Sequence, residues 1–230
     1  MEYHGVIDKL ILLKFTSRGR PNELMKCIKE YLRLANNPSR IVWLFTFDID
    51  DDKYNSVGFC DSIAHLIDNP NIVFGSSKNK IYAINRDMET IDKAEIDWHI
   101  LVSASDDQTP IVQGWDSIIR DAMPNDLDAS LWFNDGAQPR INTMEIQGHT
   151  YFNRLGYIYN PAYKSFYCDN EATDVAQKLG KLIKSDQCII RHDHPACKHP
   201  TSIKHDSLYD RNQLAWDEDK ATFLRYQNGL

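Results

Sequence analysis

The first hundred residues alternate short apolar runs with amphipathic helical stretches, and this order limits the possible folds more than any other feature. The predicted strands are residues 9–15, 41–47, 71–74 and 98–104. The predicted helices are a first one that starts near Pro21, with Leu24, Ile28, Tyr31 and Leu32 at helical spacing, and two more at residues 57–67 and 79–88. Such alternation implies an α/β fold with a mostly parallel sheet covered by helices on both faces.

The second half of the chain has a less regular pattern. It contains predicted strands at residues 130–133, 143–149 and 189–190, and predicted helices at residues 171–183 and 211–226. A chain of 230 residues is long enough for one well-buried domain. We therefore expect this half to build a lid and acceptor region on the same domain.

Polar loops follow three of the predicted strands. They are residues 16–21, the acidic run 48–52, and Ser105-Asp106-Asp107. Ligands of parallel sheets bind beyond the carboxyl ends of the strands, so these loops are predicted to form one site. Asp106 and Asp107 offer the hard oxygen ligands that Mg2+ and Mn2+ prefer, although two aspartates also suit an ordinary solvated turn.

Charge and composition narrow the class of protein. The formal net charge of −7 argues against a general nucleic-acid binder and fits an enzyme that holds an anionic substrate through a cation. The longest apolar run, Leu10 to Leu13, is too short to span a membrane, and no signal peptide is evident. Together with five cysteines, an odd number, this predicts a soluble cytoplasmic protein with reduced thiols.

Four segments, in this order, resemble motifs of family two glycosyltransferases with the GT-A fold. They are the loop 16–21, the segment 78–85 before the acidic motif, Ser105-Asp106-Asp107 in the place of the DxD-type motif, and Gly114-Trp115-Asp116. The resemblance implies a GT-A-like three-layer α/β/α sandwich. It also implies a metal-dependent transferase that moves a sugar from a nucleotide-diphosphate donor, expected to be a UDP-sugar, with Mn2+ or Mg2+ as cofactor.

The resemblance also assigns residues to roles. Residues 1–108 would form the nucleotide-sugar-binding half, and residues 109–230 the acceptor-binding half. The donor would be bound by Thr16, Ser17, Arg18, Arg20, Asp48 or Asp50, Lys80 and Asp106. Asp107 would bind the metal directly. Because serine stands in the first place of the motif, it stays open whether Asp106 would contact the ribose or the metal.

An acidic segment precedes the predicted helix 171–183. In inverting enzymes of the similar family, an acidic residue in this region removes the proton of the acceptor hydroxyl. Asp169 is the first candidate for this base and Glu171 the second. The alternative role of Asp169 is to cap the helix. Because a base is present and no covalent nucleophile is evident, we expect a single inverting displacement.

Four histidines lie between residues 192 and 205. His192 and His194 follow a short predicted strand and are candidates for a third metal ligand, which would favour Mn2+. A second interpretation is a structural zinc site drawn from Cys188, His192, His194, Cys197 and His199, and a third is a polar surface loop.

Two other activities remain open on the sequence alone. The first is a GT-A-related nucleotidyltransferase, which the single glycine of the loop 16–21 disfavours. The second is a phage-type transferase that glycosylates a modified DNA base. The acceptor is accordingly a glycan, a small molecule or a modified DNA base.

Overall fold

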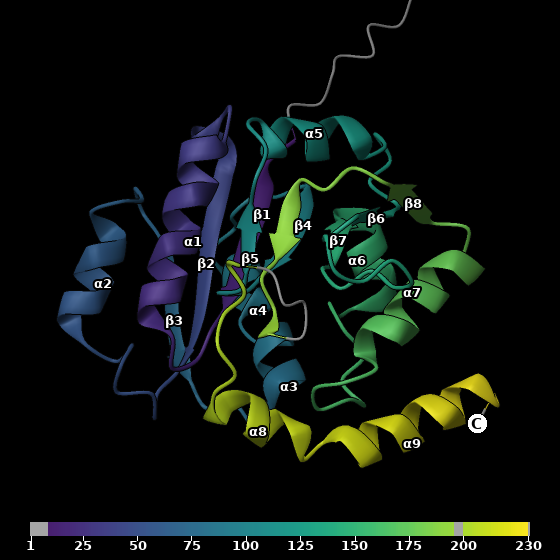
Figure 1. The fold of residues 1–230 in the computed structure, drawn as a ribbon. Coiled ribbons are helices and arrows are strands. Elements are labelled where there is room, and N and C mark those ends of the chain that lie inside the picture. The colour runs from purple at the N-terminus through teal and green to yellow at the C-terminus, as the bar shows by residue number, and fades with distance from the viewer. Residues whose placement is uncertain (1–8, 196–199, 230) are drawn as a thin grey trace, which may run out of the picture.

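The computed structural model describes residues 9–195 and 200–229, and within them a central sheet of seven strands organises the chain (Figure 1). In spatial order the strands are β3 (Asn71–Gly75), β2 (Ile41–Asp48), β1 (Ile11–Thr16), β4 (Ile100–Ala104), β7 (Ile146–Gly148), β6 (Ser130–Phe133) and β8 (Leu182–Ser185). The first four are parallel, and β7 runs antiparallel to both of its neighbours. The predicted mostly parallel sheet is therefore confirmed.

Helices cover both faces of the sheet. The helices are α1 (Pro21–Leu34), α2 (Val57–Ala64), α3 (Lys80–Asn85), α4 (Met88–Lys93), α5 (Trp115–Ala122), α6 (His149–Leu155), α7 (Cys168–Lys178), α8 (Ser207–Gln213) and α9 (Trp216–Gln227). Alternate residues of each strand point to opposite faces. Leu13 and Phe45 thus join the core under α1, α2 and α5, whereas Leu12 and Leu44 join the core under α3, α4 and α7. This is the predicted three-layer arrangement.

A second, two-stranded sheet links the middle of the chain to its last third. It consists of β5 (Gln108–Pro110) and β9 (Ile190–His192), which pair antiparallel with Gln108 opposite His192. Since β5 directly follows Asp107, this pairing brings the histidine segment to the acidic pair.

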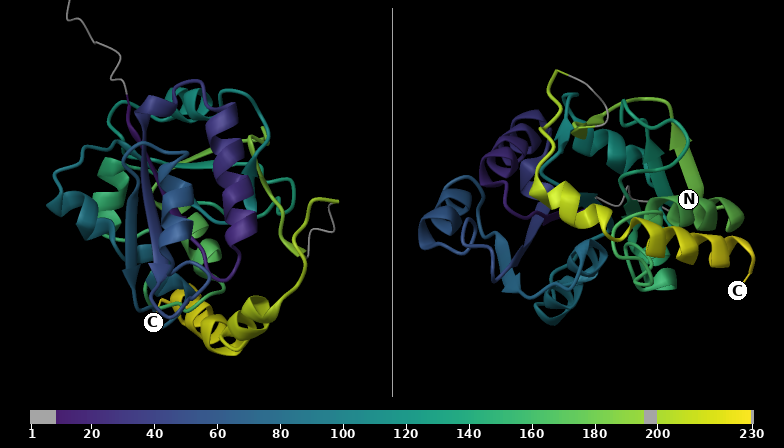
Figure 2. Two further views of the ribbon diagram at one scale, coloured as in Figure 1. Left: turned by 90° about the vertical axis from the view of Figure 1, so that its left-hand side faces the viewer. Right: turned by 60° about the horizontal axis from the view of Figure 1, so that its bottom comes forward.

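The last two helices run one after the other along one side of the molecule. Figure 1 shows α8 and α9 below α3 and α7, and the right-hand view of Figure 2 shows them crossing in front. Asp206 caps α8 by accepting from the backbone N–H of Leu208 at 3.0 Å. The single predicted helix at residues 211–226 is thus two helices.

Three further predictions about elements are wrong in detail. The predicted helix 79–88 ends at Asn85 as α3, and the separate helix α4 begins at Met88, because Asp87 between them adopts a left-handed backbone with a φ of 73°. The predicted helix 171–183 ends at Lys178, and Gly180 at a φ of 66° turns the chain into β8. The predicted strand 143–149 is only three residues long. The sequence did not predict α5, α6, β5 or β8.

Gly148, at the start of α6, is required by close packing. A Cβ atom there would lie 2.6 Å from the carbonyl carbon of Leu127, which belongs to the backbone and cannot rotate away. We expect Gly148→Ala to destabilise the fold by about 3 kcal/mol, which thermal unfolding monitored by circular dichroism would measure. Gly156→Ala is the comparison variant. A Cβ atom at Gly156 would meet open space, but the φ there is 75°, so this variant measures backbone strain without steric overlap.

Candidate active site

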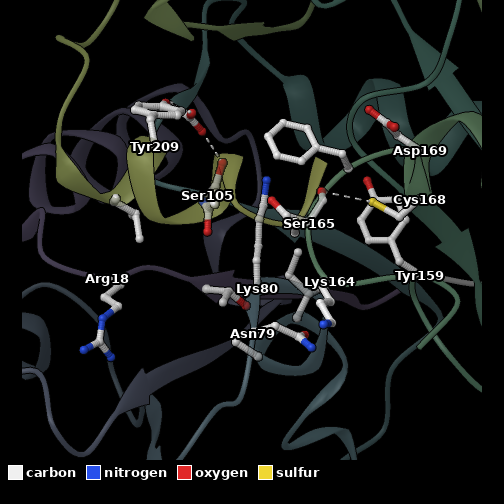
Figure 3. A pocket seen from close by; sticks show the side chains of 18 of the residues that line it. Arg18, Asn79, Lys80, Ser105, Tyr159, Lys164, Ser165, Cys168, Asp169 and Tyr209 are labelled. Atoms are coloured by element: carbon white, nitrogen blue, oxygen red, sulfur yellow. Dashed lines mark hydrogen bonds between the residues drawn. The ribbon is translucent and has the colours of Figure 1, made fainter. Parts of the chain in front are cut away.

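A cavity of about 760 Å³ opens where strands β1, β2 and β4 end (Figure 3). It is lined by residues of the three predicted loops, by the segments around α3 and residues 164–170, and by α8. The prediction that the loops after these strands share one edge is confirmed. Of the predicted site residues, those that line the cavity are Thr16, Ser17, Arg18, Arg20, Asp48, Lys80, Asp106, Asp107, Asp169, His192 and His194.

The loop after β1 is fastened to the other two loops. Arg18 donates a hydrogen bond to Asp48 at 2.7 Å. It also forms a bidentate ion pair with Asp50, at 2.7 and 2.9 Å. The backbone N–H of Gly19 donates to Asp51 at 2.6 Å. These ion pairs and hydrogen bonds fix the shape of the loop before any ligand arrives.

Asp106 is buried and serves to join elements of the site. Its carboxylate accepts from the Ser17 hydroxyl and, at 3.1 Å, from Arg20. Arg20 also pairs, at 2.7 and 2.8 Å, with Asp206, the N-cap residue of α8. Burial, reinforced by the neighbouring carboxylate of Asp107, raises the pKa of Asp106. Asp106 therefore has its own side-chain partners and links the loop after β1 to the C-terminal helices.

Asp107 has a different environment. Its carboxylate accepts from the Ser105 hydroxyl and from the Tyr209 hydroxyl at 3.0 Å, and it lies 3.5 Å from Nε2 of His192. Burial works to raise its pKa, but the positive His192 outweighs burial and holds the pKa of Asp107 well below its ordinary value. Asp107 is consequently the carboxylate of this pair that stays negative.

His192 lies between two carboxylates. On its other side, Nδ1 is 3.6 Å from Asp135, which in turn accepts from the backbone N–H groups of Ala137 and Gln138 at 2.8 and 2.7 Å. Burial alone would lower the pKa of His192, but Asp107 and Asp135 raise it to about 9. The two pairings orient the imidazole so that its Nε2 faces Asp107.

A divalent cation of the kind implied by the resemblance fits Asp107 and His192. One carboxylate oxygen and one imidazole nitrogen 3.5 Å apart make a donor set suited to Mn2+. In residues 9–195 and 200–229, no three His, Cys, Asp or Glu side chains are grouped so that they could hold a metal together. A cation here would therefore need further ligands from water or from a bound ligand.

His194 lies beside this pair. Its ring is 5.4 Å from that of His192 and 4.9 Å from that of Tyr209, centre to centre. Burial and the positive His192 lower the pKa of His194 to about 4, so the ring is neutral. The zinc interpretation also needs Cys197 and His199, which lie outside the described residues. The four cysteines that the structure describes are free thiols.

Asp169 and Lys80 face the other part of the cavity. In Figure 3, Lys80 extends into the middle of the view between Ser105 and Asp169. Burial raises the pKa of Asp169, and the positive charge of Lys80 partly opposes that shift. Asp169 does not cap α7, because the residue before the helix is Tyr167 with a φ of 60°. Its carboxylate accepts from the adjacent N–H of Asn170 at 2.9 Å and also lines the cavity.

Two predicted site residues lie apart from the cavity lining. Glu171 is buried and accepts from Asn160 at 2.6 Å and from Tyr163 at 2.5 Å, so it holds α7 against the preceding turn. Glu171 is therefore not positioned to act as a base, and that prediction is set aside in favour of Asp169. Asp50 is exposed and engaged by Arg18, and only Asp48 of that predicted pair lines the cavity.

The sequence reasoning also missed residues of the site. Tyr209 contacts Asp107, and its ring lies under the guanidinium of Arg20 at 4.4 Å. Asp206 pairs with Arg20, and Asp135 lies against His192. The N-cap pattern of Asp206 was a readable signal for a helix start, but nothing in the sequence says that this helix reaches the acidic pair.

Gly114-Trp115-Asp116, by contrast, lies in the core region. Trp115 packs edge-on against Tyr31 at 5.0 Å, and Asp116 accepts from the backbone N–H groups of Asn36 and Asn37. This segment holds α1 and α5 together.

Comparison with solved structures decides the fold. The mannosyltransferase PcManGT from Pyrobaculum calidifontis, solved in complex with GDP-Man and Mn2+, matches with a TM-score of 0.60 and 8% sequence identity over 80% of this chain. The fold is GT-A-like. The match covers 56% of that enzyme, so this chain spans a little over half of its length. No family model and no curated protein matches the sequence. No helix within the described ranges has both the length and the apolarity needed to cross a membrane.

Proposed function

We propose that this protein is a metal-dependent glycosyltransferase that moves a sugar from a nucleotide-diphosphate donor to an acceptor hydroxyl. The observation that carries the proposal is the position of Asp107. It follows the central strand β4 and lines a cavity together with His192, whose Nε2 is 3.5 Å from its carboxylate. The similar fold of a GDP-Man- and Mn2+-bound mannosyltransferase supports it.

The donor would lie over the loops that end β1, β2 and β4. Residues 1–108 supply most of this wall, including Thr16, Arg18, Asp48 and Lys80. A divalent cation held by Asp107 and His192, with His194 close by, would neutralise the charge that develops on the leaving diphosphate. Lys80 would add a positive charge to the same region without acting as a metal ligand.

The acceptor would lie on the side of residues 109–230, where Asp169 lines the cavity. A carboxylate with a raised pKa is a stronger base than an ordinary one, so Asp169 suits removal of the acceptor proton. Because we assign no covalent nucleophile, the transfer is proposed to be a single displacement that inverts the anomeric carbon.

The nucleotide of the donor is the first property to test. We expect purified protein with Mn2+ to release a nucleoside diphosphate from one member of a panel of UDP-, GDP-, ADP- and dTDP-sugars, and a UDP-sugar remains our prediction. Release should stop when EDTA removes the metal and should recover with added Mn2+. Coupled detection of nucleoside diphosphate measures both.

The same panel contains the result that would exclude the proposal. UTP and glucose-1-phosphate, offered in a parallel reaction, would yield pyrophosphate if the enzyme were a nucleotidyltransferase. If that reaction released pyrophosphate, and no nucleotide sugar released a nucleoside diphosphate, the protein would be a nucleotidyltransferase and the proposed sugar transfer would be wrong.

A further inference from the structure

An aromatic wall forms the acceptor side of the cavity. Its members are Phe166, Tyr167 and Trp216, and all three line the cavity. The ring of Trp216 lies 4.9 Å from that of Phe166 and 5.1 Å from that of Tyr167, centre to centre. Tyr167 is only two residues from Asp169, so the wall borders the proposed base.

The wall is held in place by one buried carboxylate. Asp219 of α9 is fully buried and accepts from the backbone N–H groups of Lys164, Ser165 and Phe166, each at 2.8 Å. Three hydrogen bonds to one carboxylate fix the loop against the helix that carries Trp216. The aromatic surface is therefore preorganised rather than formed on binding.

Trp216 differs from the other tryptophans in exposure. Trp43, Trp98, Trp115 and Trp132 are buried, whereas Trp216 is 38% exposed and Leu214, two residues before it, is 86% exposed. Asn170 and Asn212 also line the cavity, and neither side-chain amide bonds another described residue. A flat apolar surface beside spare amide groups suits a ligand with both an apolar face and hydroxyl groups.

The charge around Trp216 argues against a nucleic-acid acceptor. Asp217 follows it directly and is exposed, and Glu218 after it pairs with Lys164 at 2.5 Å. Lys164, a cation of the cavity lining, is already paired with Glu218, and the exposed carboxylate of Asp217 would repel the phosphates that a DNA strand would bring. A neutral ligand meets no such repulsion.

We propose that the acceptor is a carbohydrate whose pyranose ring stacks on Trp216 and presents a hydroxyl to Asp169. This inference rests on the proposed function and names its acceptor class. The acceptor oxygen forms a bond to the anomeric carbon of the donor, while the bond from that carbon to the phosphate oxygen breaks. The electron pair leaves with the nucleoside diphosphate, and the hydroxyl proton passes to the carboxylate of Asp169.

The test uses methyl α-glycosides of glucose, mannose and galactose as probes. Because the other tryptophans are buried, addition of a glycoside that binds should change the tryptophan fluorescence of the protein, and Trp216→Phe should remove that change. In transfer assays, Trp216→Ala should raise the KM for the glycoside about tenfold or more, with Trp216→Phe between it and the wild type. Leu224→Ala, at an exposed residue of the same helix outside the cavity lining, is the matched control.

Two results would overturn the inference. The first is that none of the three glycosides changes the tryptophan fluorescence and that Trp216→Ala has the same KM for the glycoside as the wild type. The second is transfer to duplex DNA containing 5-hydroxymethylcytosine and to no glycoside. Release of nucleoside diphosphate into water without acceptor is measured in the same experiment. If donor is consumed but no glycoside binds, only the acceptor assignment fails, whereas a donor that is never consumed counts against the proposed function.

Discussion

Asp107→Asn is expected to lower metal-dependent sugar transfer by about 100-fold or more, because it removes the carboxylate that would hold the cation against the leaving diphosphate. The substitution keeps the shape of the side chain and an acceptor for the Tyr209 hydroxyl, so the fold should survive. Turnover with the identified donor measures the first effect. Titration of Mn2+, followed by electron paramagnetic resonance, should show weaker binding.

The control for this variant is Asp61→Asn, an acidic residue exposed on α2 and absent from the cavity lining. It should keep both wild-type turnover and wild-type Mn2+ affinity. Full turnover of Asp107→Asn would remove the metal site from the proposal. Loss of turnover without any change in Mn2+ affinity would place the cation elsewhere.

Asp169→Asn is expected to reduce transfer by about 100- to 10,000-fold while the affinity for donor stays close to that of the wild type, because a general base acts on the acceptor and not on the nucleotide. Asparagine has nearly the same volume and can still accept from the N–H of Asn170. Steady-state turnover gives the first quantity, and calorimetric titration of the nucleoside diphosphate with Mn2+ gives the second.

Asp174→Asn is the matched control on the same helix. Asp174 pairs with Lys178 and Tyr226 and is not part of the cavity lining, so its loss should leave turnover unchanged. If Asp169→Asn turned over at nearly the normal rate, Asp169 would have no part in the chemistry. If donor affinity fell with turnover, the residue would have a role in binding instead.

The sheet and the position of the acidic pair could be predicted because they follow from local pattern. Each of β1, β2 and β4 is an apolar run, and the end of such a run in a parallel sheet is also the edge where a ligand binds. The prediction that the loop after β1 meets Asp106 needed only the order of elements. The contact between Ser17 and Asp106 agrees with it.

The parts that the sequence did not reveal depend on contacts between distant segments or on single backbone angles. β8 has no fully buried residue, so it lacks the apolar run that marks a strand. The break at Asp87 is a left-handed residue inside an otherwise helical pattern. Glu171 was the second candidate for the base after Asp169, because the sequence does not show which carboxylate already has hydrogen-bond partners.

The contacts that complete the site also join the most distant parts of the chain. Tyr209 is 102 residues from Asp107, and Asp206 is 186 residues from Arg20. Loop-closure entropy delays contacts of such long separation, whereas the pairing of β1 with β2 closes a much shorter loop. During folding, the sheet should consequently form before the pocket does. A refolding experiment should show recovery of the circular dichroism signal ahead of nucleotide binding.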